Sequence, residues 1–455
     1  MKQTDAAIIG FGTAGKALGL ALAEAGKQVA IIEQSDQMYG GACPNVACIP
    51  TKALVHAAEV SAALGGEFDD HAERYAAAID EKNELTRSLR VKSYDALANH
   101  PHVSVIDATA SFISENTLSL ACPACDDDLE ADEIFIDTGS APTIPPIPGA
   151  DGPHVYTSET LLQVRVLPER LLVIGGGYVG IEFASLFANF SSAVTIVQDG
   201  ETFLPREDEA IAAAVLACLT DRGIRVVCGA NVARIEDNVE EVLVFVQVNG
   251  QEERIPCDAV LMATGRHPNI EALDLGAAGI ELTERGGIRT DEHLRTNVPN
   301  VWALGDARGE EQFTYLAYDD FRIAASDVLG NGARTTENRG AVPYAVFCDP
   351  PFARIGMTER GARDAGLSVL TAEIAGDQIT RARMLGRPVG LLKAVVDART
   401  ERLLGLHLFC LESPEIINIA KIAMDADLPY PVLRDAIFTH PTMAESLNNL
   451  LAALE

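Results

Sequence analysis

Basic residues are scarce in this chain. Its 455 residues include 66 Asp and Glu but only 35 Lys and Arg, so the formal net charge at pH 7 is −31. Proteins that bind nucleic acid or anionic membrane surfaces need clustered Lys and Arg to neutralise phosphates. The composition therefore argues against both kinds of partner, although it gives no reason for the acidic balance.

Long apolar runs are also missing. A membrane-spanning helix needs about 18 to 20 residues almost free of charge, and no segment of the sequence meets that requirement. The first residues, Met1–Asp5, lead directly into a strand-like run and have none of the regions of a signal peptide. We expect a cytoplasmic protein whose 48% hydrophobic content can supply the cores of roughly three domains.

A regular cysteine framework is a third absence. The nine cysteines are an odd number without framework spacing, so redox chemistry at selected sites is expected in place of structural disulfides. Cys122 and Cys125 form a CxxC that could bind a metal or relay electrons, but the acidic turn residues after it favour a hairpin turn. Cys348, close to two prolines, is interpreted as a core residue.

A glycine-rich turn near the N-terminus predicts a dinucleotide site. The apolar run Ala6–Ile9 is followed by Gly10–Gly15 (GFGTAG) and by a helical pattern that ends at Gly26. Glycines at this spacing allow a tight turn, the approach of a pyrophosphate and close packing of the helix on the strand. The next apolar run, Val29–Ile32, ends at Glu33, whose carboxylate can accept hydrogen bonds from ribose hydroxyls.

Two cysteines five positions apart, Cys43 and Cys48, follow that unit. In a regular helix this separation is a rise of roughly 7.5 Å, beyond the Cα separation of about 7 Å that a disulfide tolerates. Pairing therefore requires an irregular backbone, which Pro44 favours. The segment after Pro50 has helical spacing, so Cys48 is expected near a helix N-terminus, where the dipole favours a thiolate. The spacing leaves open a reactive pair or two unpaired buried cysteines.

A second unit of the same kind follows a proline-rich linker. Leu171–Ile174 is a predicted strand, and Gly175–Gly180 (GGGYVG) repeats the glycine pattern before another helical stretch. The next strand ends at Gln198 and Asp199, where Glu or Asp would mark NADH, and no basic residue follows until Arg206. A clamp for the 2′-phosphate of NADPH is not evident, so NADH is favoured over NADPH.

The other segments contain isolated candidates. Residues 65–100 are charged, have helical spacing and predict a pair of long surface helices. From Val342 onward, strand-like runs and helices without a nucleotide loop indicate an α+β unit. Asp306, after an apolar run, could bind a polyol chain or be a turn or N-cap residue. His440 with Glu445 matches a base with its orienting carboxylate, or a surface histidine in a turn.

In this order, the motifs resemble the flavin-dependent pyridine nucleotide–disulfide oxidoreductases, the family of glutathione reductase, dihydrolipoamide dehydrogenase and mercuric reductase. The resemblance rests on two glycine signatures, CxxxxC-Ile-Pro-x-Lys, Ala-Thr-Gly-Arg, Gly-Asp and a C-terminal His-Pro-x-x-x-Glu. Short stretches are similar to a bacterial branch linked to reactive-chlorine resistance and NAD(P)H-dependent copper(II) reduction: Met38–Gly41, Phe203–Asp208, Gln312–Tyr315, Phe438–Pro441 and Glu445–Asn448.

The resemblance implies an α/β fold with two Rossmann-like dinucleotide-binding domains, one for FAD and one for NAD(P)H, and a C-terminal α+β dimerisation domain. The expected divisions are 1–149 for the first part of the FAD domain, 150–265 for the NAD(P)H domain, 266–338 for the second part of the FAD domain and 339–455 for the dimerisation domain. A homodimer is implied, because the His and Glu of the C-terminal motif act on the other subunit's cysteines in this family.

The resemblance also implies roles for single residues. Cys48 would be the thiol next to the flavin and Cys43 the thiol that meets the substrate. Lys52 and Glu182 would pair beside the flavin ring, and Tyr178 would cover the nicotinamide pocket and swing away when the cofactor binds. The expected cofactor contacts are Gly10, Gly12, Ala14, Gly15, Glu33, Gly41, Ala42, Lys52, Thr138, Gly139, Gly175, Gly177, Tyr178, Gly180, Gln198, Gly265, Arg266, Gly305 and Asp306.

The implied function is NAD(P)H-dependent reduction of copper(II) or another oxidant, in defence against oxidative stress, through FAD and a Cys43–Cys48 disulfide whose sulfurs bind the metal transiently. The alternatives are a disulfide reductase for lipoamide or a small thiol, a mercuric reductase-like enzyme, and a flavin-bound redox sensor without turnover. Ala42 and Ala47 replace the Thr and Gly common in the motif. The C-terminus lacks the cysteine pair of mercuric reductase, which disfavours mercury handling of that type.

Overall fold

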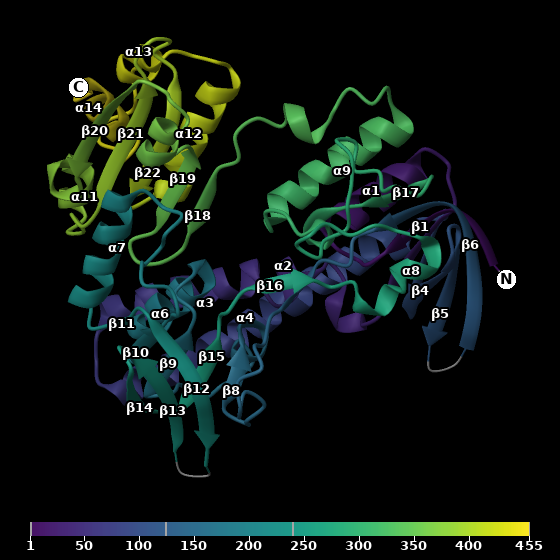
Figure 1. The fold of residues 1–455 in the computed structure, drawn as a ribbon, viewed down its shortest axis with the longest axis horizontal. Helices are drawn as coiled ribbons and strands as arrows, with labels where there is room; N and C mark the ends of the chain where they lie inside the picture. The colour runs from purple at the N-terminus through teal and green to yellow at the C-terminus, as the bar shows by residue number, and fades with distance from the viewer. Residues whose placement is uncertain (1, 123–124, 239–240, 455) are drawn as a thin grey trace.

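The computed structural model describes residues 2–122, 125–238 and 241–454, which form three large sheets and two small ones with helices around them (Figure 1). The first two large sheets belong to the two glycine-rich units, and the third lies in the C-terminal unit. That unit stands at the opposite end of the molecule from the N-terminus (Figure 1).

The first sheet positions the N-terminal glycine turn. Its parallel part has the order β3-β2-β1-β6 with β17 against β6, and β5 and β4 extend it in antiparallel pairing. The apolar end of β1 is buried, as expected of a strand covered on both faces. The strands are β1 (Lys2–Ile9), β2 (Val29–Glu33), β3 (Val103–Asp107), β4 (Thr109–Ser114), β5 (Thr117–Cys122), β6 (Cys125–Ile136) and β17 (Val301–Ala303).

The hairpin predicted at the CxxC is confirmed, because β5 and β6 are antiparallel neighbours with Cys122 opposite Cys125 in register. Residues 123 and 124 between them lie outside the described residues. Cys122 is disulfide-bonded, which the hairpin interpretation did not predict.

The second sheet is fully parallel and contains the second glycine turn. Its order is β11-β10-β9-β15-β8, and a separate three-stranded antiparallel sheet, β12-β13-β14, packs against it. The strands are β8 (Val155–Thr157), β9 (Arg170–Ile174), β10 (Ala193–Val197), β11 (Arg225–Val227), β12 (Ala230–Asp237), β13 (Val242–Val248), β14 (Gln251–Cys257) and β15 (Ala259–Met262). The short pair β7 (Ser140–Pro142) and β16 (Arg266–Pro268) joins this unit to the first.

The C-terminal unit is an antiparallel sheet with helices against it, which confirms the α+β prediction. The sheet order is β18-β19-β22-β21-β20. Its elements are β18 (Tyr344–Val346), β19 (Phe352–Gly356), α10 (Glu359–Asp364), β20 (Val369–Ala375), α11 (Thr380–Met384), β21 (Leu391–Asp397), β22 (Leu403–Phe409), α12 (Ser413–Asp425), α13 (Tyr430–Arg434) and α14 (Ser446–Ala452). Cys348 is buried between β18 and β19, as predicted.

The helices of the first two units are α1 (Thr13–Glu24), α2 (Ala42–Asn45), α3 (Cys48–Leu64), α4 (Phe68–Ala98), α5 (Ser158–Leu161), α6 (Tyr178–Asn189), α7 (Glu209–Asp221), α8 (Leu275–Ala278) and α9 (Thr314–Leu329). α3 packs against α4 and α6, so it links the two glycine-rich units. None of the helices in the described part of the chain combines the length and the hydropathy that a bilayer-spanning segment requires.

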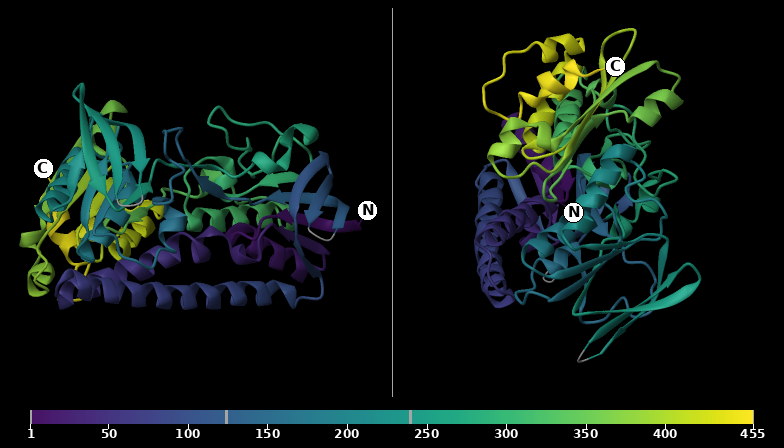
Figure 2. Two further views of the ribbon diagram at one scale, coloured as in Figure 1. Left: turned by 90° about the horizontal axis from the view of Figure 1, so that it is seen from below. Right: turned by 90° about the vertical axis from the view of Figure 1, so that its left-hand side faces the viewer.

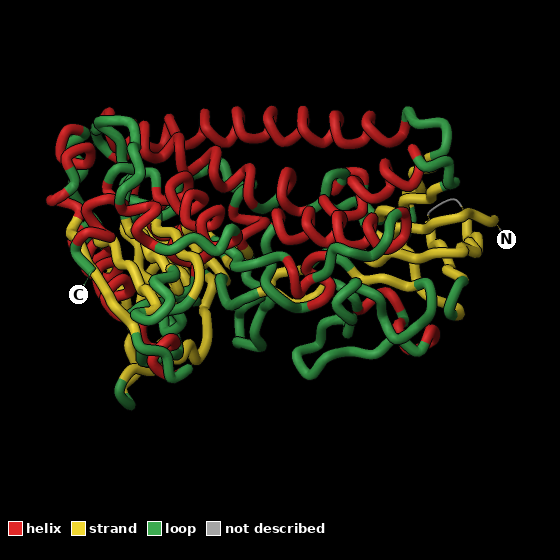
Figure 3. The backbone as a smooth tube through the Cα atoms, turned by 90° about the horizontal axis from the view of Figure 1, so that it is seen from above, coloured by secondary structure: helices red, strands yellow, loops and turns green. Residues whose placement is uncertain are grey.

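The predicted pair of surface helices over residues 65–100 is wrong, because most of this segment is the single 31-residue helix α4. The helix contains no Gly or Pro that would interrupt it, and a capping box between Glu67 and Asp70 fixes its start. It runs along one side of the molecule (Figures 2 and 3). It is also more than a surface helix, since Tyr75 and Lys82 are buried and donate hydrogen bonds to carbonyls before β9.

Candidate active site

The two cysteines lie where one helix ends and the next begins. Cys43 is in α2, and Cys48 is the first residue of α3. Between them Val46 has φ −139° and ψ 6°, and Ala47 has φ −133° and ψ −105°. The predicted irregular backbone is confirmed, and so is the place of Cys48 at a helix N-terminus. The break follows α2 and does not fall at Pro44, which lies in the first turn of that helix, where proline is tolerated.

The two thiols differ in acidity. Both are free thiols in this structure. A hydrogen bond with Cys43 lowers the pKa of Cys48 to about 6, and Thr314 and Lys52 also lower it against the effect of burial. The Sγ atom of Cys48 lies 3.3 Å from the hydroxyl oxygen of Thr314. The same contact with Cys48, together with burial, raises the pKa of Cys43. The site therefore favours a thiolate at Cys48 and a thiol at Cys43 near neutral pH.

An ion pair lies beside the thiols. The ammonium group of Lys52, one turn along α3 from Cys48, is 2.7 Å from a carboxylate oxygen of Glu182 in α6. The other oxygen of Glu182 accepts the backbone N–H of Phe347 at 2.8 Å, and the Lys52 ammonium lies 4.8 Å from the centre of the Phe347 ring. The pair thus has one member from each glycine-rich unit, and Phe347 of the C-terminal unit contacts both members.

The two glycine turns have the same local geometry. Gly10 has φ +102°, and a Cβ there would lie 2.3 Å from the carbonyl oxygen of Asp137 at the end of β6. Gly175 has φ +110°, and a Cβ there would lie 2.3 Å from the carbonyl oxygen of Ala263 at the end of β15. Both positions therefore require glycine, because the turn crosses the end of the neighbouring strand at close range.

A single continuous cleft contains most of the predicted site residues. It is lined by Gly10, Gly12, Glu33, Gly41, Ala42, Cys43, Cys48, Lys52, Thr138, Gly139, Gly175, Gly177, Tyr178, Glu182, Gln198, Gly265, Arg266 and Asp306. Four predicted contacts do not line it: Ala14, Gly15, Gly180 and Gly305. His440 and Glu445 also lie outside this cleft in the single chain.

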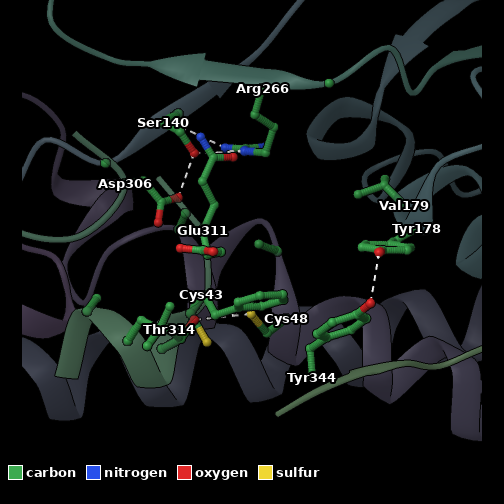
Figure 4. A pocket seen from close by; sticks show the side chains of 18 of the residues that line it. Cys43, Cys48, Ser140, Tyr178, Val179, Arg266, Asp306, Glu311, Thr314 and Tyr344 are labelled. Carbon is green, nitrogen blue, oxygen red and sulfur yellow. Dashed lines mark hydrogen bonds between the residues drawn. The ribbon is translucent and has the colours of Figure 1, made fainter. Parts of the chain in front are cut away.

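Acidic and hydroxyl side chains line the half of the cleft formed by the first sheet. Asp306 accepts a hydrogen bond from the Ser140 hydroxyl at 2.7 Å, and Ser140 in turn accepts one from Arg266 at 2.9 Å (Figure 4). Glu33 is buried and accepts the backbone N–H of Phe11 at 3.1 Å. The hydroxyl oxygen of Thr138 is buried and has no hydrogen-bond partner among the described residues. These acidic and hydroxyl groups can bond the hydroxyl groups of a dinucleotide, and the glycine turn allows close approach of its pyrophosphate. The residues present therefore fit a dinucleotide such as FAD.

Sequence reasoning missed Asp137, which is buried behind the first glycine turn. One of its carboxylate oxygens accepts the backbone N–H of Gly15 at 2.6 Å. Burial raises its pKa well above the ordinary value, and the nearby carboxylates of Asp306 and Asp320 add to this effect. A signal was present in the sequence, since Asp137-Thr138-Gly139 in the first unit stands where Ala263-Thr264-Gly265 stands in the second.

The second half of the cleft has no acid at the end of β10. Gln198 donates hydrogen bonds from its side-chain amide to the carbonyls of Gly200 at 2.9 Å and Thr202 at 3.0 Å. Asp199 and Arg206 are exposed and also line the cleft. At the mouth, the Tyr178 hydroxyl lies 3.2 Å from that of Tyr344 (Figure 4).

Comparison with known proteins supplies the deciding observation. Residues 4–320 match the family model described as pyridine nucleotide-disulphide oxidoreductase, and residues 342–451 match the dimerisation domain of that family. The chain belongs to this family. The resemblance inferred from the motifs is therefore confirmed, as is the α/β fold with a C-terminal dimerisation domain.

Several oxidoreductases of the family are similar over nearly all of this chain. The chain is 45% identical to the probable pyridine nucleotide-disulfide oxidoreductase RclA of Escherichia coli (strain K12), covering 100% of both proteins. It is 32% identical to a mercuric reductase of Staphylococcus aureus, over 99% of this chain and 82% of that protein. A solved Cu(II) complex of the HOCl-induced flavoprotein disulfide reductase RclA from Escherichia coli has a TM-score of 0.93 and 45% identity, with 99% of each chain covered.

This family member carries its histidine and glutamate in the dimerisation domain. The Nδ1 atom of His440 is 2.7 Å from a carboxylate oxygen of Glu445, and the His440 side chain is 72% exposed. Among the described residues, the ring hydrogen-bonds Glu445 and neither Cys43 nor Cys48. No group of three or more His, Cys, Asp or Glu side chains within those residues is arranged to hold a metal ion.

Asp137→Asn should alter the pH dependence of stability. The asparagine keeps an acceptor for the Gly15 N–H but removes the titrating carboxyl. The raised pKa means that the folded protein holds this proton more tightly than the unfolded chain, so the stability it contributes is lost as pH rises above about 4 towards the folded pKa. Thermal melts of the flavin-loaded protein should show that Asp137→Asn gains melting temperature relative to the unaltered protein as pH rises over this window.

The relative gain in the free energy of unfolding is about 1.4 kcal/mol for each unit between the folded and unfolded pKa values of Asp137. Asp132→Asn is the matched control, because Asp132 is exposed on the same strand. A difference in melting temperature between the unaltered protein and Asp137→Asn that stays constant with pH would contradict a buried, protonated Asp137.

Proposed function

We propose that the protein is an NAD(P)H-dependent flavoprotein that reduces copper(II), or another small oxidant, through a disulfide between Cys43 and Cys48. The observation that carries this proposal is the pair itself, in which Cys48 has a pKa lowered to about 6 beside the Lys52–Glu182 ion pair. A soft thiolate pair at the end of a dinucleotide cleft suits a soft or reducible metal. The Cu(II) complex of the similar Escherichia coli flavoprotein supports this choice of acceptor.

Bound FAD would supply two-electron transfer between a nicotinamide and a disulfide. Gly10, Gly12 and Glu33 would bind its adenosine diphosphate half, and Asp306 its ribityl chain. The Lys52 ammonium would favour the Cys48 thiolate. Re-formation of the disulfide from the dithiol releases two electrons and two protons. The two electrons reduce two copper(II) ions to copper(I), or, together with the two protons, they reduce one substrate disulfide to two thiols.

A disulfide substrate is the second candidate. The observation that favours it is the hydrogen bond between His440 and Glu445, because thiol–disulfide exchange needs a group that transfers a proton to and from the attacking thiol. In this proposal the protein is a homodimer, supported by its dimerisation domain, and His440 of each subunit serves the cysteines of the other.

The test is anaerobic reduction of the flavin-loaded protein by NADH, followed by mixing with copper(II), mercury(II), oxidised glutathione or lipoamide in parallel. Rapid flavin reoxidation by copper(II) is the expected result. Rapid reoxidation by glutathione or lipoamide, with none by copper(II), would replace the metal proposal with the disulfide one.

The nucleotide preference gives a separate prediction, in which NADH is the better reductant. Gln198→Glu should raise the preference for NADH over NADPH by about tenfold, because a carboxylate accepts the ribose hydroxyls more strongly and repels a 2′-phosphate. The measurement is the ratio of kcat/KM values for the two nucleotides. Glu201→Gln, an exposed change on the same loop, is the control. A ratio unchanged in Gln198→Glu would show that the adenosine ribose does not bind at this position.

A further inference from the structure

A buried carboxylate holds the tyrosine at the mouth of the nucleotide cleft. The Tyr178 hydroxyl donates a hydrogen bond to one oxygen of Glu207 at 2.5 Å, and the Tyr344 hydroxyl donates to the same oxygen at 2.6 Å. The Glu207 side chain is 0% exposed. Its other oxygen has no hydrogen-bond partner among the described residues, and the nearest cation is the Arg354 guanidinium at 3.5 Å.

The partners of Tyr178 come from outside its own helix. Its ring lies 5.4 Å from that of Tyr344 and 6.1 Å from that of Phe352, both of which belong to the C-terminal unit. Glu207 lies in the segment between β10 and α7, and the next residue, Asp208, is 3.0 Å from the buried ammonium of Lys393 in β21. The tyrosine is therefore held between a carboxylate of its own unit, Glu207, and two aromatic rings of the C-terminal unit, Tyr344 and Phe352.

The hydrogen bond from the Tyr178 hydroxyl to Glu207 is charge-assisted. Its acceptor is a carboxylate removed from solvent, and such charge-assisted bonds are shorter and stronger than bonds between neutral groups. If Tyr178 moves away, Tyr344 and Arg354 remain on Glu207, so the buried charge keeps partners in the open state. This arrangement allows two positions for Tyr178 while favouring the closed one.

We infer that Glu207 is a latch for the nicotinamide pocket, which keeps Tyr178 closed over the cleft until a nicotinamide breaks their hydrogen bond. The inference rests on the proposed function, because it requires the second half of the cleft to bind NAD(P)H. A latch of this kind lowers the apparent affinity by the fraction of protein that is open, so weakening it should tighten nucleotide binding. Glu207 is a positioning residue, since it acts through Tyr178.

The test measures binding without turnover. Flavin-loaded protein is titrated calorimetrically with the unreactive tetrahydro analogues of NADH and NADPH. Glu207→Gln replaces the charged acceptor with a neutral one, and Tyr178→Phe removes the donor but keeps the ring. Each variant should bind the preferred analogue about tenfold more tightly, the effect of losing one hydrogen bond to a charged group.

A double variant and a matched control complete the test. Because both changes remove the same bond, Glu207→Gln combined with Tyr178→Phe should bind no more tightly than either alone. Glu209→Gln, the same chemical change two residues away on an exposed side chain paired with Arg360, should have no effect. A fall in the KM for NADH without a matching fall in kcat is the expected kinetic signature.

Equal affinities in the unaltered protein and both single variants, or additive effects in the double variant, would overturn the latch alone. Failure of the unaltered protein to bind either analogue would overturn the latch and the nicotinamide part of the proposed function together.

Discussion

Cys43→Ser should abolish electron delivery to the acceptor while leaving reduction of the bound flavin by NADH intact. The acceptor rate is expected to fall by about a thousandfold or more, because a serine hydroxyl can neither form the disulfide nor act as a soft nucleophile at neutral pH. Cys48 lies at the start of α3 with the lowered pKa, whereas Cys43 lies in α2, towards the other end of the irregular segment. Stopped-flow absorbance of the flavin, first with NADH and then with acceptor, separates the two half-reactions.

Two further variants make this result specific. Cys48→Ser should also stop acceptor reduction, since either substitution removes the disulfide. Cys218→Ser changes a free, half-buried thiol on α7 outside the site and should behave as the unaltered protein does. Full acceptor turnover in Cys43→Ser would mean that electrons leave directly from the flavin.

His440→Gln should lower turnover with a disulfide acceptor by about 10²- to 10⁴-fold, the usual contribution of a positioned acid–base group. Glu445 holds the ring through its 2.7 Å contact, so Glu445→Gln should cause a smaller loss in the same direction. Flavin reduction by NADH should remain unchanged in both variants, because neither residue lines the cleft.

The proposed exchange of histidines between subunits can be tested with the same variant. If His440 acts on the partner subunit's cysteines, mixing His440→Gln with Cys43→Ser subunits creates dimers with one intact site. Random mixing of two inactive variants should then restore about a quarter of the full activity. No recovery in mixed dimers of confirmed composition would show that each subunit uses its own histidine or none.

Most of the site residues that the sequence predicted do line the cleft. Both glycine turns, the cysteine pair and Lys52 lie in short local motifs, whose spacing and flanking strands reveal their role. The pairing of Lys52 with Glu182 needed the family resemblance, since 130 residues separate them. The kinds of element were easier to predict than their boundaries, as α4 illustrates, because surface charge hides the face that packs on α3.

The sequence alone does not predict the contacts between distant segments. Tyr344 meets Tyr178 and Glu207 only because the C-terminal unit folds back onto the second unit, and nothing local at these positions indicates the contact. Asp137 was missed for a different reason. A carboxylate at the end of a strand is usually a turn residue, and only the crossing of the first glycine turn at that point makes it buried.

A relay of two electrons from the nicotinamide through Cys43 and Cys48 is tested most directly by counting thiols during anaerobic titration. Flavin-loaded protein with its disulfide oxidised is titrated with NADH, and thiols are counted with a chromogenic disulfide reagent after denaturation. If the cysteines relay the electrons, the first equivalent of NADH produces two new thiols per flavin in the unaltered protein and none in Cys43→Ser. Bleaching of the flavin by that equivalent with no new thiols in either protein would contradict it.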